Sequence, residues 1–96
     1  MLILVTYDVS TETKEGRGRL RRVAKICESY GQRVQKSVFE CQVDPATRAK
    51  LRTRLLGAIK PEEDSLRFYV MGESGFRNVE HHGLKPSQDM RGTLIV

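Results

Sequence analysis

The stretch that decides the fold is LILVTYD, residues Leu2–Asp8. It combines aliphatic and β-branched residues and ends at an acid, a pattern typical of a buried central strand whose carboxyl end emerges at the sheet edge. The apolar pattern stops at Asp8, so residues 9–16 are predicted to form a polar loop. The chain therefore begins with a strand that carries a carboxylate at its end.

A helix is predicted next, from about Arg17. Its apolar face consists of residues three or four positions apart: Leu20, Val23, Ala24, Cys27 and Tyr30. Gly31 follows at the place of a C′ residue, so we expect the helix to stop there.

The segment Arg33–Val43 is strand-like, but its apolar phase slips near Ser37. Val34 and Val38 share one parity, whereas Phe39 has the other. A bulge within one strand and a tight reversal between two short strands would both produce this slip. The sequence leaves the two alternatives open.

A second helix is predicted after Asp44-Pro45, an N-cap residue followed by proline at the first helical position, and it should end before Pro61. Its buried stripe is Leu51, Leu55, Ala58 and Ile59, and its outer face carries Arg48, Lys50, Arg52 and Arg54. Apolar and polar residues then alternate over Ser65–Met71, which predicts a half-buried strand.

The remaining residues are less regular. We expect a turn at 72–75, a short strand at 76–80, a loop at 83–92 and a last strand at 94–96. The complete order predicts the α+β class: a ferredoxin-like βαββαβ sandwich with an additional C-terminal strand. We expect one domain over residues 1–96, with its core in 1–71 and a variable tail, 72–96, that packs on a dimer partner. A chain this short buries only about two-thirds of its unfolded surface, so an uncovered sheet face favours a homodimer.

Positive charge is concentrated in the middle of the chain. The net charge is +5, yet residues 14–60 hold thirteen of the 17 basic residues and only four acids. Such a local excess is typical of proteins that bind a phosphate backbone. The two cysteines lack CxxC spacing, and the sequence shows no signal peptide and no long apolar run. These features predict a cytoplasmic protein without a membrane role.

Asp8 is the strongest candidate metal ligand, because it lies where a rigid strand meets solvent. The ordinary alternative is an acid that merely ends a strand. One carboxylate cannot build a protein-only cage, but Mg²⁺ keeps several waters and uses one or two carboxylates with substrate phosphates. A two-fold axis beside Asp8 would add a second Asp8, and the ion could then activate water for phosphodiester hydrolysis.

The first helix carries the candidate nucleic-acid-binding residues. Lys14, Arg17, Arg21 and Lys25 recur every three or four positions and form one basic stripe, with Arg22 beside it. Arg19 lies instead at the border of the apolar face, where it either snorkels or extends toward the Asp8 end of the sheet.

Two further sets of residues are candidates for the same site. Arg33, Gln35, Ser37 and Phe39 share one strand parity, so they are predicted to form a row that can hold a phosphate and stack a base. A core or dimer-contact role for Phe39 is the ordinary alternative. Tyr7 lies beside Asp8 but on the opposite pleat face, where a core aromatic is expected.

Four segments of this sequence closely resemble the CRISPR-associated "Cas two" family: VTYDV at 5–9, RLRRVAK at 19–25, YGQRVQKSVFE at 30–40 and SLRFY at 65–69. The resemblance covers residues 1–71. It implies a ferredoxin-like protomer, a homodimer, and Mg²⁺ held at the dimer interface by Asp8. It also implies functional positions at Tyr7, Asp8, Arg33 and Phe39 and at one arginine of the first helix, with Arg19 and Arg22 both compatible.

The resemblance leaves two functions open. In the first, the chain is a metal-dependent endonuclease acting on RNA or duplex DNA, with Asp8 catalytic. In the second, it is a DNA-binding scaffold for the CRISPR integrase "Cas one" during spacer acquisition, and Asp8 is structural.

Overall fold

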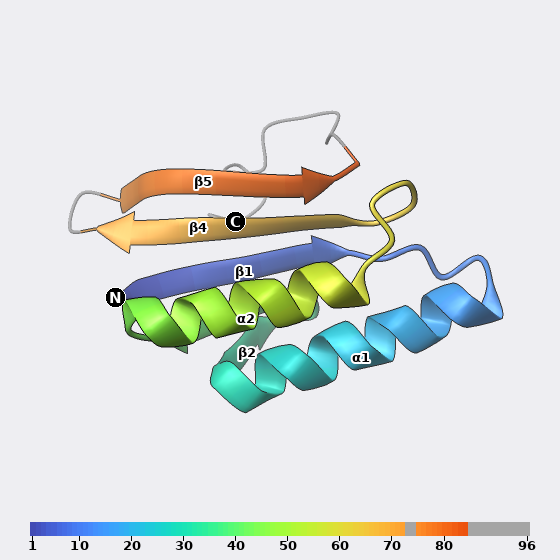
Figure 1. Cartoon of the computed structure of the whole chain (residues 1–96), viewed down its shortest axis with the longest axis horizontal. Coiled ribbons are helices and arrows are strands. Elements are labelled where there is room, and N and C mark those ends of the chain that lie inside the picture. Colours follow the sequence, from blue (N-terminus) through green and yellow to red (C-terminus); the bar gives the residue numbers. More distant parts are fainter. Residues whose placement is uncertain (73–74, 85–96) are drawn as a thin grey trace.

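The computed structural model describes residues 1–72 and 75–84, and of residues 75–78 it describes the backbone alone. Along the chain the elements are β1 (Leu2–Asp8), α1 (Lys14–Tyr30), β2 (Gln32–Gln35), β3 (Val38–Gln42), α2 (Pro45–Ala58), β4 (Ser65–Gly72) and β5 (Gly75–Gly83). β1 lies at the centre of one antiparallel sheet of order β2-β3-β1-β4-β5 (Figure 1). The predicted ferredoxin-like sandwich with an additional strand is confirmed.

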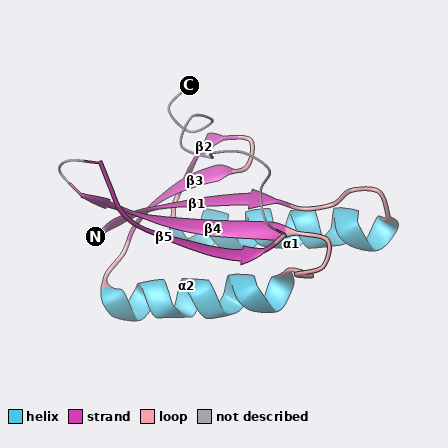
Figure 2. Cartoon of the chain, turned by 90° about the horizontal axis from the view of Figure 1, so that it is seen from above, coloured by secondary structure: helices cyan, strands magenta, loops and turns pink. Residues whose placement is uncertain are grey.

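Both helices cover the same face of the sheet (Figure 2). Side chains of β1 alternate between the two faces of the sheet. Ile3, Val5 and Tyr7 are buried beneath the helices, whereas Asp8 is exposed. Both predicted helical stripes contribute to this core, with Cys27 of α1 and Leu51 of α2 fully buried. No helix in the described part of the chain is both long and apolar enough to cross a membrane.

The phase slip near Ser37 is a reversal of the chain. β2 and β3 are separate antiparallel strands joined by a turn at Lys36 and Ser37, and the register also shifts between Arg33 and Gln35. The prediction that Arg33, Gln35, Ser37 and Phe39 form one row is therefore wrong. Phe39 lies directly opposite Arg33 on the neighbouring strand, because the chain folds back between them.

The structure changes both the predicted first residue of α1 and the predicted reason why the helix ends at Gly31. The helix begins at Lys14 rather than near Arg17, because the Thr13 side chain caps it by accepting the Gly16 N–H at 3.0 Å. At the other end Gly31 is extended, with φ −161°, and is not a left-handed C′ residue. Glycine is needed there because a Cβ would collide with the Glu40 carbonyl of β3.

α2 begins as predicted. The Asp44 side chain accepts the Thr47 N–H at 2.7 Å, and this bond holds the pKa of Asp44 below its ordinary value. Pro45 follows at the start of the helix, which ends at Ala58, before Pro61.

β5 is attached both to β4 and to α2. Its Glu80 accepts a hydrogen bond from Arg52 of α2 at 2.7 Å and contacts His82 at 2.7 Å. The strand extends the predicted segment 76–80 to Gly83. Predictions for the loop beyond Leu84 and for the strand 94–96 lie outside the described residues.

The carboxylate of Asp64 is fully buried and connects four parts of the chain. It accepts hydrogen bonds from the Arg19 side chain of α1 at 2.8 and 3.2 Å, from the Ser10 N–H at 3.1 Å and from the Lys60 N–H at 2.8 Å. Burial alone would raise the pKa of Asp64, but these donors outweigh it and hold the pKa below its ordinary value. Asp64 thus fixes the end of the sheet at which β1 stops.

Asp64→Asn is expected to lower the free energy of unfolding by about 3 kcal/mol, because it leaves the Arg19 charge without its buried partner. The carboxylate stabilises the fold above its unfolded-state pKa of about 4, and this contribution is lost as the pH falls through the lower folded-state pKa. Urea unfolding of parent and variant from pH 7 to pH 2 measures both effects. The two stability curves should converge at low pH.

Glu63→Gln is the matched control, because Glu63 contacts the same arginine at 3.1 Å from a partly exposed position. Its stability should stay close to that of the parent. Equal losses for the two variants would contradict the special role of the buried acid.

Candidate active site

A cleft of about 520 Å³ opens beside the carboxyl end of β1. α1 forms one wall and the turn between β2 and β3 forms the other. The lining residues are Tyr7, Asp8, Val9, Leu20, Arg21, Ala24, Arg33, Lys36 and Ser37. Three cations and one carboxylate thus meet over a partly apolar floor, an arrangement suited to a phosphate group next to a metal-binding acid.

Asp8 is the acid of this cleft. It is the last residue of β1, is paired with Ser65 of β4, and is exposed. Among the described residues no hydrogen bond or ion pair occupies its carboxylate. The carboxylate is therefore available to a ligand from outside the chain.

The donor set of the cleft fits a hard cation that retains water. Residues 1–72 and 75–84 contain no group of three or more His, Cys, Asp and Glu side chains able to hold a metal. A zinc site made of four protein ligands does not fit this arrangement. Mg²⁺ fits, because one or two carboxylates together with waters and substrate phosphates are sufficient for it.

Tyr7, Phe39 and Arg33 form a stack beside Asp8. The Tyr7 and Phe39 ring centroids are 6.2 Å apart, and the Arg33 guanidinium lies 4.9 Å from the centroid of the Phe39 ring. Arg33 also donates to the Lys36 carbonyl at 2.6 Å, which fixes its position at the cleft. Phe39 is fully buried, so its contribution is to position Arg33 and Tyr7.

Tyr7 and the two cysteines are poor proton acceptors or nucleophiles. Burial raises the pKa of Tyr7, so its phenol is neutral near pH 7. Burial also raises the pKa of Cys27 to about 12 and that of Cys41 to about 11. The chemistry of the cleft therefore depends on Asp8 and the cations.

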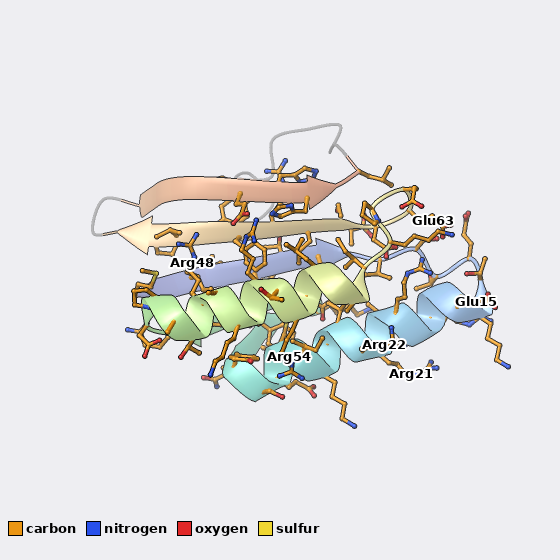
Figure 3. The ribbon with its side chains drawn as sticks, viewed as in Figure 1. Glu15, Arg21, Arg22, Arg48, Arg54 and Glu63 are labelled. Carbon is orange, nitrogen blue, oxygen red and sulfur yellow. The ribbon has the colours of Figure 1, made fainter. Side chains whose placement is uncertain are left out.

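The arginine of α1 that lines the cleft is Arg21. The resemblance is compatible with Arg19 or Arg22 as the functional arginine of the first helix, and neither of them lines the cleft. Arg19 does extend toward the Asp8 end of the sheet, but it pairs there with Asp64 at 2.8 Å. Figure 3 shows Arg21 and Arg22 leaving α1 in different directions. The other basic residues assigned to nucleic-acid binding, Lys14, Arg17, Arg22 and Lys25, are exposed along the helix.

Sequence reasoning missed two residues of this region, Lys36 and Asp64, whereas Ser37 was among the predicted candidates. Lys36 and Ser37 line the cleft because they form the turn between β2 and β3, which the sequence did not distinguish from a bulge. Asp64 supports the loop after Asp8, and as the last of three consecutive acids before β4 it was not predicted to be buried. The one available signal was Arg19, a charged residue at the border of an apolar face that required a buried partner.

Comparison with known proteins gives consistent matches over most of the chain. The CRISPR-associated endoribonuclease Cas2 of Chlorobaculum tepidum is 60% identical over 96 residues, which cover all of both chains. The protein of the same name from Nitratidesulfovibrio vulgaris is 56% identical, and the match covers 100% of this chain and 94% of that protein.

A solved structure agrees with these relatives. The crystal structure of Streptococcus pyogenes Cas2 at pH 6.5 superposes with a TM-score of 0.71 and 57% identity, covering 76% of this chain and 88% of that one. The family model described as CRISPR associated protein Cas2 matches residues 1–79, the segment that contains β1, the cleft and Asp64. The chain belongs to the CRISPR-associated protein Cas2 family.

Proposed function

We propose that this chain is a Mg²⁺-dependent endonuclease that hydrolyses phosphodiester bonds of RNA, and that it works in the cytoplasm during CRISPR spacer acquisition in antiviral defence. The observation that carries the proposal is the exposed carboxylate of Asp8, which pairs with no described residue and lies at a cleft lined by three cations. Relatives that share 60% and 56% identity are named endoribonucleases, which supports RNA as the substrate. Duplex DNA is the alternative substrate.

The three cations would bind the scissile phosphate. Arg21 comes from α1, whereas Arg33 and Lys36 come from the opposite wall, so the group would be held from two sides. In hydrolysis a water oxygen attacks phosphorus and the bond to the leaving ribose oxygen breaks, while negative charge increases on the non-bridging oxygens. Fixed cations stabilise that charge more in the transition state than in the ground state.

Asp8 would hold the metal at the edge of this phosphate site. When bound, Mg²⁺ lowers the pKa of a coordinated water and offsets phosphate charge. Tyr7 and Phe39 remain neutral and buried, so their part is to hold Arg33 in place. No histidine lines the cleft, and the proposal requires none.

A homodimer would complete the metal site with a second Asp8. Asp8 lies on the sheet face opposite the helices, where the partly exposed Leu4 and Met71 supply apolar surface for a second copy. An ion shared across a two-fold axis would then have two carboxylates.

A non-catalytic scaffold is the second candidate function, in which the dimer holds DNA for the CRISPR integrase "Cas one". The observation that favours it is the exposed basic stripe of α1, which extends beyond the cleft through Lys14, Arg17 and Lys25. Phosphate contacts of this kind need no metal.

Asp8→Asn should reduce single-turnover cleavage of a labelled single-stranded RNA about a hundredfold or more, because the metal loses its protein ligand. EDTA should abolish the parent's cleavage, and added Mg²⁺ should restore it. Gel analysis of the RNA products over time measures both effects.

Glu12→Gln provides the control, since it neutralises another exposed acid a few residues further along the same loop. Its cleavage rate should match the parent's. Cleavage that survives Asp8→Asn would overturn the hydrolytic mechanism, and a parent that binds nucleic acid but cuts neither RNA nor duplex DNA would establish the scaffold instead.

Arg21→Gln and Arg22→Gln make the same chemical change at adjacent positions. Arg21 lines the cleft, so its loss should lower the cleavage rate at saturating protein roughly a hundredfold. Loss of Arg22 should weaken RNA binding, but it should lower the cleavage rate at saturating protein far less than the loss of Arg21 does. Equal effects on the saturated rate would show that Arg21 makes no special contact with the reacting phosphate.

A further inference from the structure

α2 carries four basic residues and no acid, and these residues divide between two sides of the helix. Arg48 and Arg52 face β5, where both contact Glu80. Lys50 and Arg54 are exposed and form no ion pair with any described residue. This second pair is four positions apart, so both side chains project from the same side of α2.

Arg54 is held against Tyr30, the last residue of α1. Its Nη1 donates to the Tyr30 hydroxyl at 3.3 Å, and its guanidinium carbon lies 5.5 Å from the ring centroid. Figure 3 shows Arg54 projecting from α2 toward this end of α1. The phenol and the guanidinium together form a platform on which a base can stack.

This platform borders a hollow of about 360 Å³ between the two helices. The hollow is lined by Tyr30, Ala49, Lys50, Thr53 and Arg54. Its walls are mostly apolar, and among the described residues that line it the charged groups are the cations Lys50 and Arg54. Apolar walls suit an unpaired base, whereas a duplex would present only its phosphates here.

The hollow and the Asp8 cleft lie at different positions along α1. Arg21 lines the cleft and Tyr30 lines the hollow, and these residues are nine positions apart, which is about 14 Å along the helix at 1.5 Å per residue. Exposed Lys25 and Arg22 lie on the surface between them. A single strand would follow α1 over about 14 Å of its length to reach from one to the other.

We propose that the hollow is a second nucleotide-binding subsite, which takes one unpaired nucleotide of single-stranded RNA. The base stacks on the Tyr30–Arg54 platform, and Lys50 and Arg54 bind the adjacent phosphates. The proposal takes its ligand from the proposed function, but it concerns binding and requires no cleavage.

The test measures binding of a fluorescein-labelled 20-nucleotide RNA in EDTA, over a series of salt concentrations. Lys50→Gln and Arg54→Gln should each weaken binding and make the slope of log Kd against log salt shallower by roughly 0.7, the value for one lost single-strand phosphate contact. Lys60→Gln makes the same change at an exposed lysine beyond the hollow and should leave the slope unchanged.

Stacking is tested at Tyr30 with RNA that contains 2-aminopurine, whose fluorescence falls when the base stacks. Tyr30→Phe keeps the ring and should retain the quenching, whereas Tyr30→Leu should lose it and weaken binding roughly tenfold. The Tyr30 variants should bind duplex RNA of the same sequence with equal affinity.

Unchanged affinity and salt slope in the Lys50→Gln, Arg54→Gln double variant would overturn the subsite. Equal loss of single-stranded and duplex binding in Tyr30→Leu would overturn its preference for an unpaired base. Both readouts are independent of cleavage, so a failure of the nuclease mechanism at Asp8 is distinguishable from a failure of this subsite.

Discussion

The buried carboxylate of Asp64 is the constraint on which this end of the molecule depends. An ionised acid without access to water is strongly unfavourable unless donors surround it, and here the donors come from the loop after β1, from α1 and from the turn after α2. None of these segments can move alone without uncovering the charge. Ser10, one of the donors, lies two residues beyond Asp8, so the requirement to satisfy Asp64 also fixes where β1 ends.

Two acids at the same end of the sheet therefore have opposite roles. Asp64 directly precedes β4 and is saturated with donors, whereas Asp8 ends the adjacent strand and is exposed. Arg19 and Arg21 show the same division on α1, since the first pairs with the buried acid and the second lines the cleft. The structural ion pair thus fixes the position of the cleft, while Asp8 and Arg21 remain exposed at it.

Local patterns were sufficient to predict much of this arrangement. The apolar run of β1, the Asp44-Pro45 start of α2 and the alternation in β4 each depend on neighbouring residues, and Asp8 was found because a strand end is a local feature. Tertiary contacts decided the rest. Parity could not distinguish a bulge from a reversal at Ser37. The only sequence signal that separates buried Asp64 from an exposed acid is indirect, the position of Arg19 at the border of the apolar face of α1. Arg21 was predicted to bind nucleic acid, but its position at the cleft depends on the β2–β3 turn on the opposite wall. A short strand was predicted at 76–80, but its extension to Gly83 and its attachment to α2 through Glu80 depend on tertiary contacts.

The two helices place many cations side by side with few acids between them, and α2 contains no acid at all. Like charges held close together repel, so the folded chain without a ligand carries electrostatic strain. A bound polyanion relieves that repulsion, and a ligand that binds only the folded state stabilises it by mass action. If the ligand is nucleic acid, as proposed, its binding contributes to the folding equilibrium of this protein, and the unbound chain is then the less stable form.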